Sequence, residues 1–221
     1  MPTVKIGDNT GDDYSGTIDT RIVSSAATTN YGSGSSFQVN KWGSGNWTHG
    51  LVSFTGLSNI SPTVTVSAAT VYLYLSSTAG TNTQTMSFKR LLQNWVELQS
   101  TWNIYSTGNN WGTAGATNVT DRSSTDSGGM SVDGTTGVYK SMSSAQLAQD
   151  VADFINGVYS NYGWHIERTD GSNDSTTRTF ISKDGNNAQR PYLSVTYEAA
   201  GGGLSIPIAM YHYQHHIGSG V

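Results

Sequence analysis

Residues 67–77 read SAATVYLYLSS, and this stretch decides the fold class. Val71, Leu73 and Leu75 alternate with two tyrosines, so an extended chain would place the aliphatic side chains on one face and the aromatic rings on the other. Aliphatic and aromatic residues in alternation are typical of half-buried strands. The stretch therefore predicts a β-strand with one face in a hydrophobic core.

The same kind of pattern recurs on both sides of this strand. Shorter strands are predicted at Thr17–Val23, Ser36–Val39, 50–60, 85–92 and 190–198. The 221-residue chain contains 26 glycines but only 4 prolines, with 12 tyrosines and 6 tryptophans, and this composition favours short strands joined by polar turns. With 35% hydrophobic residues, the chain can bury the core of one globular domain.

One segment has helical periodicity instead. Residues 143–161 read SSAQLAQDVADFINGVYSN, which predicts one amphipathic helix from about Ser144 to Val158. Either Ser143 or Ser144 can cap its start, and Gly157 suits its end. The face predicted to be buried consists of Leu147, Val151, Phe154, Ile155 and Val158.

The chain between Tyr105 and Ser143 is rich in Gly, Ser, Thr, Asn and Asp and has few apolar residues. Because this stretch has few apolar residues to mark a strand or a helix, the sequence predicts a long loop. Loops of that length are usually functional or mobile.

Several phrases occur in a fixed order along the chain. They include TNYGSGSSFQV, GLVSFTGLSNI, NWVELQSTWN and RPYLSVTY. This ordered set resembles DNRLRE-type domains, a family that includes alginate-type carbohydrate-binding modules, over residues 17–198. The resemblance implies a β-sandwich with an accessory binding or structural role, of the kind often appended to extracellular polysaccharide-degrading enzymes or to surface proteins. We therefore expect an all-β, jelly-roll-type β-sandwich over residues 1–200, with one amphipathic helix and with Trp95 and Trp102 in its core.

Charge and composition exclude several kinds of partner. The formal net charge is −4, so no basic stripe favours nucleic acid, and no apolar stretch is long enough to cross a membrane. The chain has no cysteine and therefore no disulfide. Its first residues, MPTVKIGDNTGDDYSG, lack the basic and apolar regions of a signal peptide, so we expect no secretion signal in this chain.

Groups suited to catalysis are few. Glu97, Glu167, His49 and His165 could exchange protons, but none of them lies in a motif with a known mechanism. Paired carboxylates of a glycosidase stay an alternative, because their separation is spatial. The sequence therefore predicts a protein that is not an enzyme.

Glycan-binding side chains are predicted in two glycine-rich turns. Trp42 and Trp47 lie in KWGSGNWTHG and Trp111 lies in NNWGTAG, where rings are less needed in a core. Exposed rings offer apolar faces to sugar C–H groups. The alternative is that these rings cap the ends of the sandwich or meet a neighbouring subunit. Cations for an acidic polymer would come from Lys41, Arg90 or Arg122.

No cofactor is predicted, with structural calcium as the one alternative. GDNTGDD brings Asp8, Asp12 and Asp13 close together, and carboxylate oxygens are calcium ligands. Neither this run nor DRSSTDSGG matches an EF-hand loop, and such residues more often cap turns through side chain to backbone hydrogen bonds.

The C-terminal residues 201–221 form a glycine linker followed by a predicted docking tail, LSIPIAMYHYQHHIGSGV. This segment is too short to anchor the chain in a membrane. Its three histidines could ligate a metal ion, but a terminal segment does not provide the surrounding groups that would orient them. The alternation favours an extended strap that adds to a sheet edge or lies in a groove. It also loosely resembles apolar, aromatic tails of phage proteins. The docking residues are predicted to be Ile206, Ile208, Met210, Tyr211, His212 and Tyr213.

Two functions follow from these observations. The first is a non-enzymatic structural or attachment component of an extracellular assembly, most concretely a phage virion decoration or fibre protein that could also bind glycans. Its partners would be other virion or surface subunits in a homo-oligomer, and it would lie on the virion or the extracellular surface. The alternative is a polysaccharide-binding module accessory to a carbohydrate-active enzyme.

Overall fold

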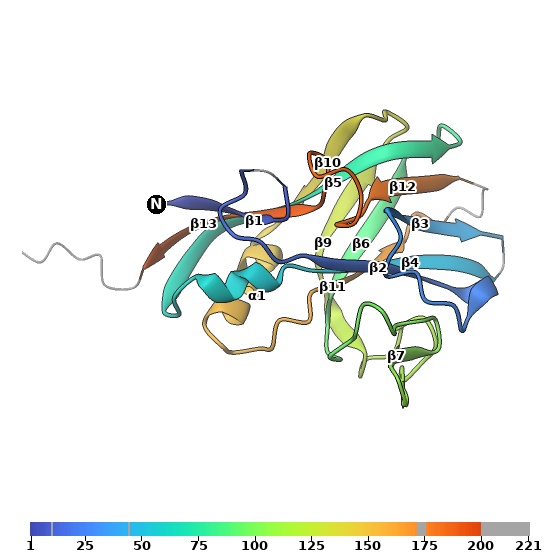
Figure 1. Ribbon diagram of the computed structural model, residues 1–221, viewed down its shortest axis with the longest axis horizontal. Coiled ribbons are helices and arrows are strands. Elements are labelled where there is room, and N and C mark those ends of the chain that lie inside the picture. The colour runs from blue at the N-terminus through green and yellow to red at the C-terminus, as the bar shows by residue number, and fades with distance from the viewer. Residues whose placement is uncertain (10, 44, 172–175, 200–221) are drawn as a thin grey trace, which may run out of the picture.

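The computed structural model describes residues 1–9, 11–43, 45–171 and 176–199, and this part of the chain is mostly β with one α-helix, α1 (Figure 1). This confirms the predicted all-β class with a single helix. None of the helices in the described part is long and apolar enough to cross a bilayer. The strands are β1 (Thr3–Gly7), β2 (Ile18–Val23), β3 (Ser36–Trp42), β4 (Asn46–Ser53), β5 (Val64–Ala79), β6 (Gln84–Leu91), β7 (Ile104–Ser106), β8 (Asn109–Asn110), β9 (Arg122–Val132), β10 (Val138–Ser143), β11 (Trp164–Arg168), β12 (Thr177–Ile181) and β13 (Tyr192–Ala199).

Most of these strands belong to one antiparallel sheet that curls around its core (Figure 1). It has 11 strands, in the order β1-β13-β5-β12-β3-β4-β11-β6-β9, with β10 also paired to β5 and β2 also paired to β4. Strands β7 and β8 form a separate pair.

The sheet is continuous where the sequence predicted two packed sheets. Strand β3 pairs with β12 through Ser36–Asn40 and with β4 through Asn40–Trp42, so it connects the two halves by hydrogen bonds. A strand that bends from one neighbour to another curves a sheet without breaking it. The resulting shape is a large curled sheet.

The main core lies inside the curl. The predicted alternation of β5 is confirmed: Val71, Leu73 and Leu75 are fully buried, whereas Tyr72 and Tyr74 are partly exposed. The aliphatic face therefore packs inward, and the tyrosines lie on the outer face of the sheet.

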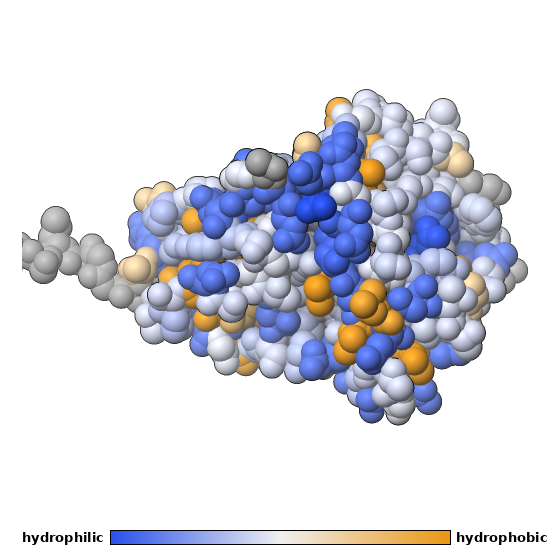
Figure 2. Space-filling model, viewed as in Figure 1, coloured by the Kyte–Doolittle hydropathy of each residue, from blue (hydrophilic) through white to orange (hydrophobic). Residues whose placement is uncertain are grey.

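A second, smaller core lies under the loop that follows β6. It contains Ile22, Leu51, Leu91, Trp95, Trp111 and Ala116, and Trp102 packs against it. Trp95 is 4% exposed and Trp102 is partly exposed, so the first is a core residue as predicted and the second lies at the core's edge. Figure 2 shows a mostly hydrophilic face with hydrophobic atoms gathered near β7; the exposed hydrophobic residues of this loop are Val96, Leu98 and Val119.

Helix α1 (Ala145–Ile155) packs against β5 and β9. Ser144 is its N-cap, because its Oγ accepts a hydrogen bond from the Leu147 N–H at 2.8 Å. The predicted buried residues Leu147, Val151, Phe154 and Ile155 are confirmed. Val158 is 60% exposed, so its predicted burial is wrong. The helix ends before Gly157, whose φ of +73° turns the chain away from the helical face.

The predicted loop between Tyr105 and Ser143 is wrong in its second half, which forms β9 and β10. Strand β9 pairs with β6, and β10 pairs with β5. The sequence of β9, RSSTDSGGMSV, hides its period because small residues replace apolar ones. Gly128 shows why: a Cβ there would lie 2.5 Å from the Met142 sulfur, so any larger residue would force the buried Met142 side chain to move.

Candidate functional site

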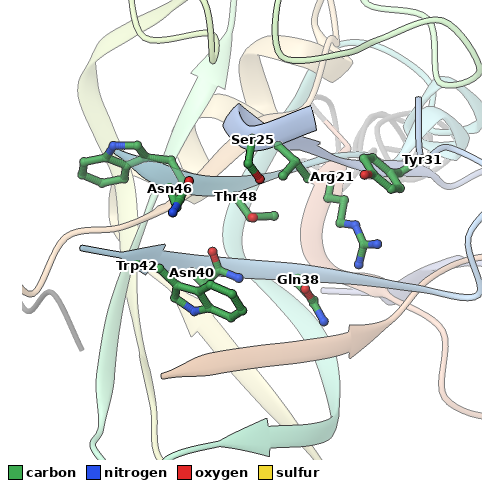
Figure 3. Close-up of a pocket in the computed structure, with 10 residues that line it drawn as sticks. Arg21, Ser25, Tyr31, Gln38, Asn40, Trp42, Asn46 and Thr48 are labelled. Carbon is green, nitrogen blue, oxygen red and sulfur yellow. The ribbon is translucent and has the colours of Figure 1, made fainter. Parts of the chain in front are cut away.

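A pocket lies where β2, β3 and β4 run side by side, and we call it the Arg21 pocket (Figure 3). Its volume is about 240 Å³. The lining residues are Arg21, Val23, Ser25, Tyr31, Gln38, Asn40, Trp42, Asn46, Trp47 and Thr48. The hairpin that joins β3 to β4 contributes two predicted glycan-binding rings, Trp42 and Trp47, and places both at this one pocket.

The two rings are held differently. Trp42 is 45% exposed, and its indole N–H donates to the Thr177 hydroxyl at 3.2 Å, which fixes the ring plane and leaves much of the ring in solvent. The ammonium group of Lys41 lies 4.5 Å from the centroid of the Trp47 ring. A cation over an aromatic face is a favourable contact, so Lys41 supports Trp47.

Arg21 supplies a charge to this pocket. No hydrogen bond or ion pair joins its guanidinium to any described residue, and its Nε is buried without a partner. The guanidinium packs on the Tyr31 ring, with 4.4 Å between its central carbon and the ring centroid. Every other arginine has an acceptor: carboxylates lie near Arg90, Arg122 and Arg168, and backbone carbonyls accept from Arg178 and Arg190.

Neutral polar groups surround this charge. Gln38 donates to Thr179 at 3.4 Å, a long hydrogen bond, and no described residue bonds to the side chains of Asn40 or Thr48. Amides and hydroxyls both donate and accept, which suits sugar hydroxyls. The pocket therefore combines ring faces, an unneutralised cation and free polar groups.

Sequence reasoning missed Arg21 as a site residue. The sequence does contain a signal for this residue, namely a cation among the β-branched residues of the strand Ile18–Val23. A charge in such a strand needs either a partner or a function. Neither the partner nor the neighbouring strands can be read from the sequence alone.

Four of the residues predicted for glycan binding do not line this pocket: Lys41, Arg90, Trp111 and Arg122. Trp111 is 5% exposed, and its indole N–H donates to the Thr101 carbonyl at 3.0 Å, so it is a core residue without an accessible face. The expectation that a glycine-rich turn would leave it free is wrong, because the turn folds back over the second core. Arg122 forms an ion pair with Glu167, with 2.6 Å between Nη1 and Oε1.

The three aspartates predicted as calcium ligands each hold a turn. Asp8 accepts from the N–H groups of Gly16 and Thr17, and Asp12 accepts from Asn9. Asp13 accepts from the Lys5 N–H at 2.7 Å. Their carboxylates do not converge, since within the described residues they form no group with metal-ligand spacing. This arrangement matches the turn-capping alternative.

A different cluster does converge in the described part of the chain: His49, His165 and Glu167 have potential ligand atoms within 4.8 Å of one another. Arg122 already lies among them, because its Nη1 is 2.8 Å from His165 Nδ1 and 2.6 Å from Glu167 Oε1. The guanidinium is a permanent cation, so these two groups are satisfied without a metal ion.

The two histidines are neutral. Burial lowers the pKa of His49 to about 4 and lowers the pKa of His165 well below its ordinary value. Their rings meet at 3.0 Å between His165 Nε2 and His49 Nδ1, and both atoms lie near the Gly115 carbonyl oxygen. Gly115 has φ +87°, and a Cβ there would lie 2.6 Å from the Trp102 ring, so glycine is required at this position.

The predicted docking tail, residues 201–221, lies outside the described residues. Its proposed contacts stay predictions.

Residues 12–120 match the family model of carbohydrate-binding module family 96. The match includes β2, β3 and β4 and therefore every residue that lines the Arg21 pocket. No curated protein matches the chain. Over residues 12–120, just under half of the chain, this match confirms the resemblance to the DNRLRE-type family that the motifs indicated.

Proposed function

We propose that the chain is a non-catalytic polysaccharide-binding module and that it binds an acidic polysaccharide in the Arg21 pocket. The observation that carries the proposal is the guanidinium of Arg21, which has no acceptor among the described residues and lies in a pocket walled by Trp42 and Trp47. Arg21 is partly buried, and a cation that has lost part of its hydration without gaining a counter-ion favours an anion as its partner. A uronic acid carboxylate would complete this pair in bidentate geometry.

The surrounding groups support a sugar over a simple anion. Ring faces pack on sugar C–H groups, and Asn40, Asn46 and Thr48 can exchange hydrogen bonds with hydroxyls. A pocket of about 240 Å³ is smaller than the ~300–1,000 Å³ typical of drug-sized ligands, so it fits one sugar ring of a longer chain.

The strand order supports the predicted jelly-roll type. The pairs place β3-β12-β5-β10 in one row and β4-β11-β6-β9 in another. In this proposal the two rows correspond to the two halves of a jelly roll that stay joined through β3.

The family match favours the accessory-module role over a phage virion role. The predicted docking tail, one of the observations behind the virion interpretation, lies outside the described residues. We therefore propose a role outside the cell, beside or attached to a carbohydrate-active enzyme, with the polysaccharide as the main partner.

A glycan array followed by calorimetry tests this function. We expect hits among uronate-containing glycans, with a Kd that weakens at least tenfold in Arg21→Gln, because the ion pair is lost. Lys5→Gln is the matched control, since it removes one positive charge from an exposed position in the middle of β1. Equal affinity of Arg21→Gln and Lys5→Gln, or hits confined to neutral glycans, would contradict the proposal.

A further inference from the structure

A second cavity, which we call the Trp102 cavity, shares Trp47 with the Arg21 pocket. Its volume is about 200 Å³. The lining residues are Trp47, His49, Trp102, Ala114, Thr117 and Glu167. One indole therefore contributes to both hollows, which makes them neighbours on the surface.

One residue that lines the Trp102 cavity, His49, has an unsatisfied polar atom. His49 is 2% exposed, and its Nε2 has no hydrogen-bond partner among the described residues. Its other ring nitrogen, Nδ1, is occupied, because it lies 3.0 Å from both the Gly115 carbonyl oxygen and His165 Nε2. A buried polar atom without a partner is costly, which points to a ligand or water as the missing partner.

The hydrogen-bond network limits what this partner can be. Arg122 only donates, so His165 Nδ1 must accept and the proton of this neutral ring is on Nε2. That proton goes either to His49 Nδ1 or to the Gly115 carbonyl. In the first case His49 Nε2 is a donor, and in the second it is an acceptor. A hydroxyl group can serve either tautomer, because it both donates and accepts.

The charge of the cavity differs from that of the Arg21 pocket. Glu167 lines the Trp102 cavity, and its counter-ion Arg122 is already engaged with both Glu167 and His165. A carboxylate or sulfate placed here would lie beside the Glu167 carboxylate without a free cation to pair with, whereas a hydroxyl could donate to that carboxylate. The rings of Trp47 and Trp102 offer apolar faces beside these polar groups.

We propose that the Trp102 cavity is a second sugar subsite, which takes a neutral, hydroxyl-bearing residue while the neighbouring acidic residue of the same polymer binds at Arg21. This inference rests on the proposed function and deepens it. The preferred ligand is then a polysaccharide in which uronic acids alternate with neutral sugars, in preference to a polymer of uronic acid alone.

The test compares two oligosaccharides of equal length in calorimetry. One is an all-uronate oligomer, and the other alternates uronate with a neutral hexose. Ala114→Leu fills the cavity from an exposed loop position and leaves the buried network intact, and Val119→Leu is its control, because Val119 lies in the same loop, is 72% exposed and does not line the cavity.

We expect the intact protein and Val119→Leu to bind the alternating oligomer at least fivefold more tightly than the all-uronate oligomer, and Ala114→Leu to lose this preference. The ¹⁵N resonance of His49 Nε2 should also shift with the alternating oligomer and stay unchanged with the all-uronate one. Equal binding of both oligomers, or an unshifted His49 at saturation, overturns the second subsite and leaves the Arg21 site intact. If neither oligomer binds, the proposed function itself has failed.

Discussion

At the scale of single residues, Arg21 and Trp111 show that residue type and local sequence do not determine whether a side chain is buried or paired. Trp111 lies in a glycine-rich turn that predicts an exposed ring, but it is 5% exposed. Arg21 lies in a strand that predicts a paired or solvated charge, but its guanidinium has no acceptor among the described residues. Both outcomes depend on segments distant in sequence: Trp111 packs in a core with Ile22 and Leu51, and Arg21 lies in a pocket that also needs β3 and β4.

Trp111→Ala should therefore lower the stability of the protein, whereas Trp42→Ala should weaken ligand binding. Trp111→Ala should destabilise the protein by about 3–5 kcal/mol, because it leaves a cavity in the second core. Trp42→Ala should leave stability nearly unchanged and weaken polysaccharide binding, because its ring is 45% exposed at the pocket. Denaturant unfolding and calorimetry measure the two effects; a strongly destabilised Trp42→Ala would show that this ring is structural.

Asp19 predicts a pH dependence of stability. Burial raises its pKa to about 8, although the Lys183 backbone N–H donates to it at 2.7 Å. Unfolding returns its pKa to about 3.9, so the folded state holds an extra proton between pH 4 and 8 and stability falls by up to ~1.4 kcal/mol per unit as pH rises through that window. The loss is complete above pH 8.

Asp19→Asn removes this titration and should flatten the fall in unfolding free energy between pH 5 and 8. Glu198→Gln, an exposed carboxylate on β13, controls for the change in net charge. The histidines act in the opposite direction at lower pH, since the lowered pKa of His49, about 4, makes stability fall as the pH drops below about 6.5. Parallel pH profiles of Asp19→Asn and the unaltered protein would contradict the raised pKa.

At the scale of elements, periodicity predicted the parts of the chain whose side chains are large. Strand β5 and helix α1 were found because Leu, Val and Phe mark their buried faces. Strand β9 was missed because it uses Ser and Gly where it passes Met142. The end of the helix was placed too late because Val158 continues the helical pattern after the chain has turned at Gly157. Close approach of backbones, which requires small residues, removes the very signal that periodicity needs.

Two substitutions at the helix test its buried face. Val151→Asp places a charge in the main core, where Val151 is fully buried, and should cost several kcal/mol, on the order of the ~3–5 measured for uncompensated buried charges. Val158→Asp is the matched control, because Val158 is 60% exposed and should tolerate the charge. Thermal unfolding compares them, and equal melting temperatures would mean that the helix packs with another face.

At the scale of the whole molecule, one curled sheet supports two adjacent hollows. The ordered motifs indicated the family and the all-β class, because they mark the strands and the turns between them. They could not indicate the site, since the Arg21 pocket needs β2, β3 and β4 in register, and the Trp102 cavity also needs Glu167 from β11. Residues from distant parts of the sequence meet only after the sheet has curled.

Truncation after residue 200 tests the predicted tail. Strand β13 ends at Ala199, so every described strand remains, and we expect an unchanged melting temperature. The prediction that the tail mediates assembly would appear as a loss of oligomers in light scattering. Oligomers that persist in the truncated protein would contradict this role.

The most direct test of the central claim is an NMR titration with a uronate-containing oligosaccharide that follows the Arg21 Nε–H and the six tryptophan indole N–H signals. We predict that Arg21, Trp42 and Trp47 shift together and saturate at one Kd, while the buried Trp95 and Trp111 stay unchanged. Saturable binding that leaves Arg21, Trp42 and Trp47 unshifted would contradict the account.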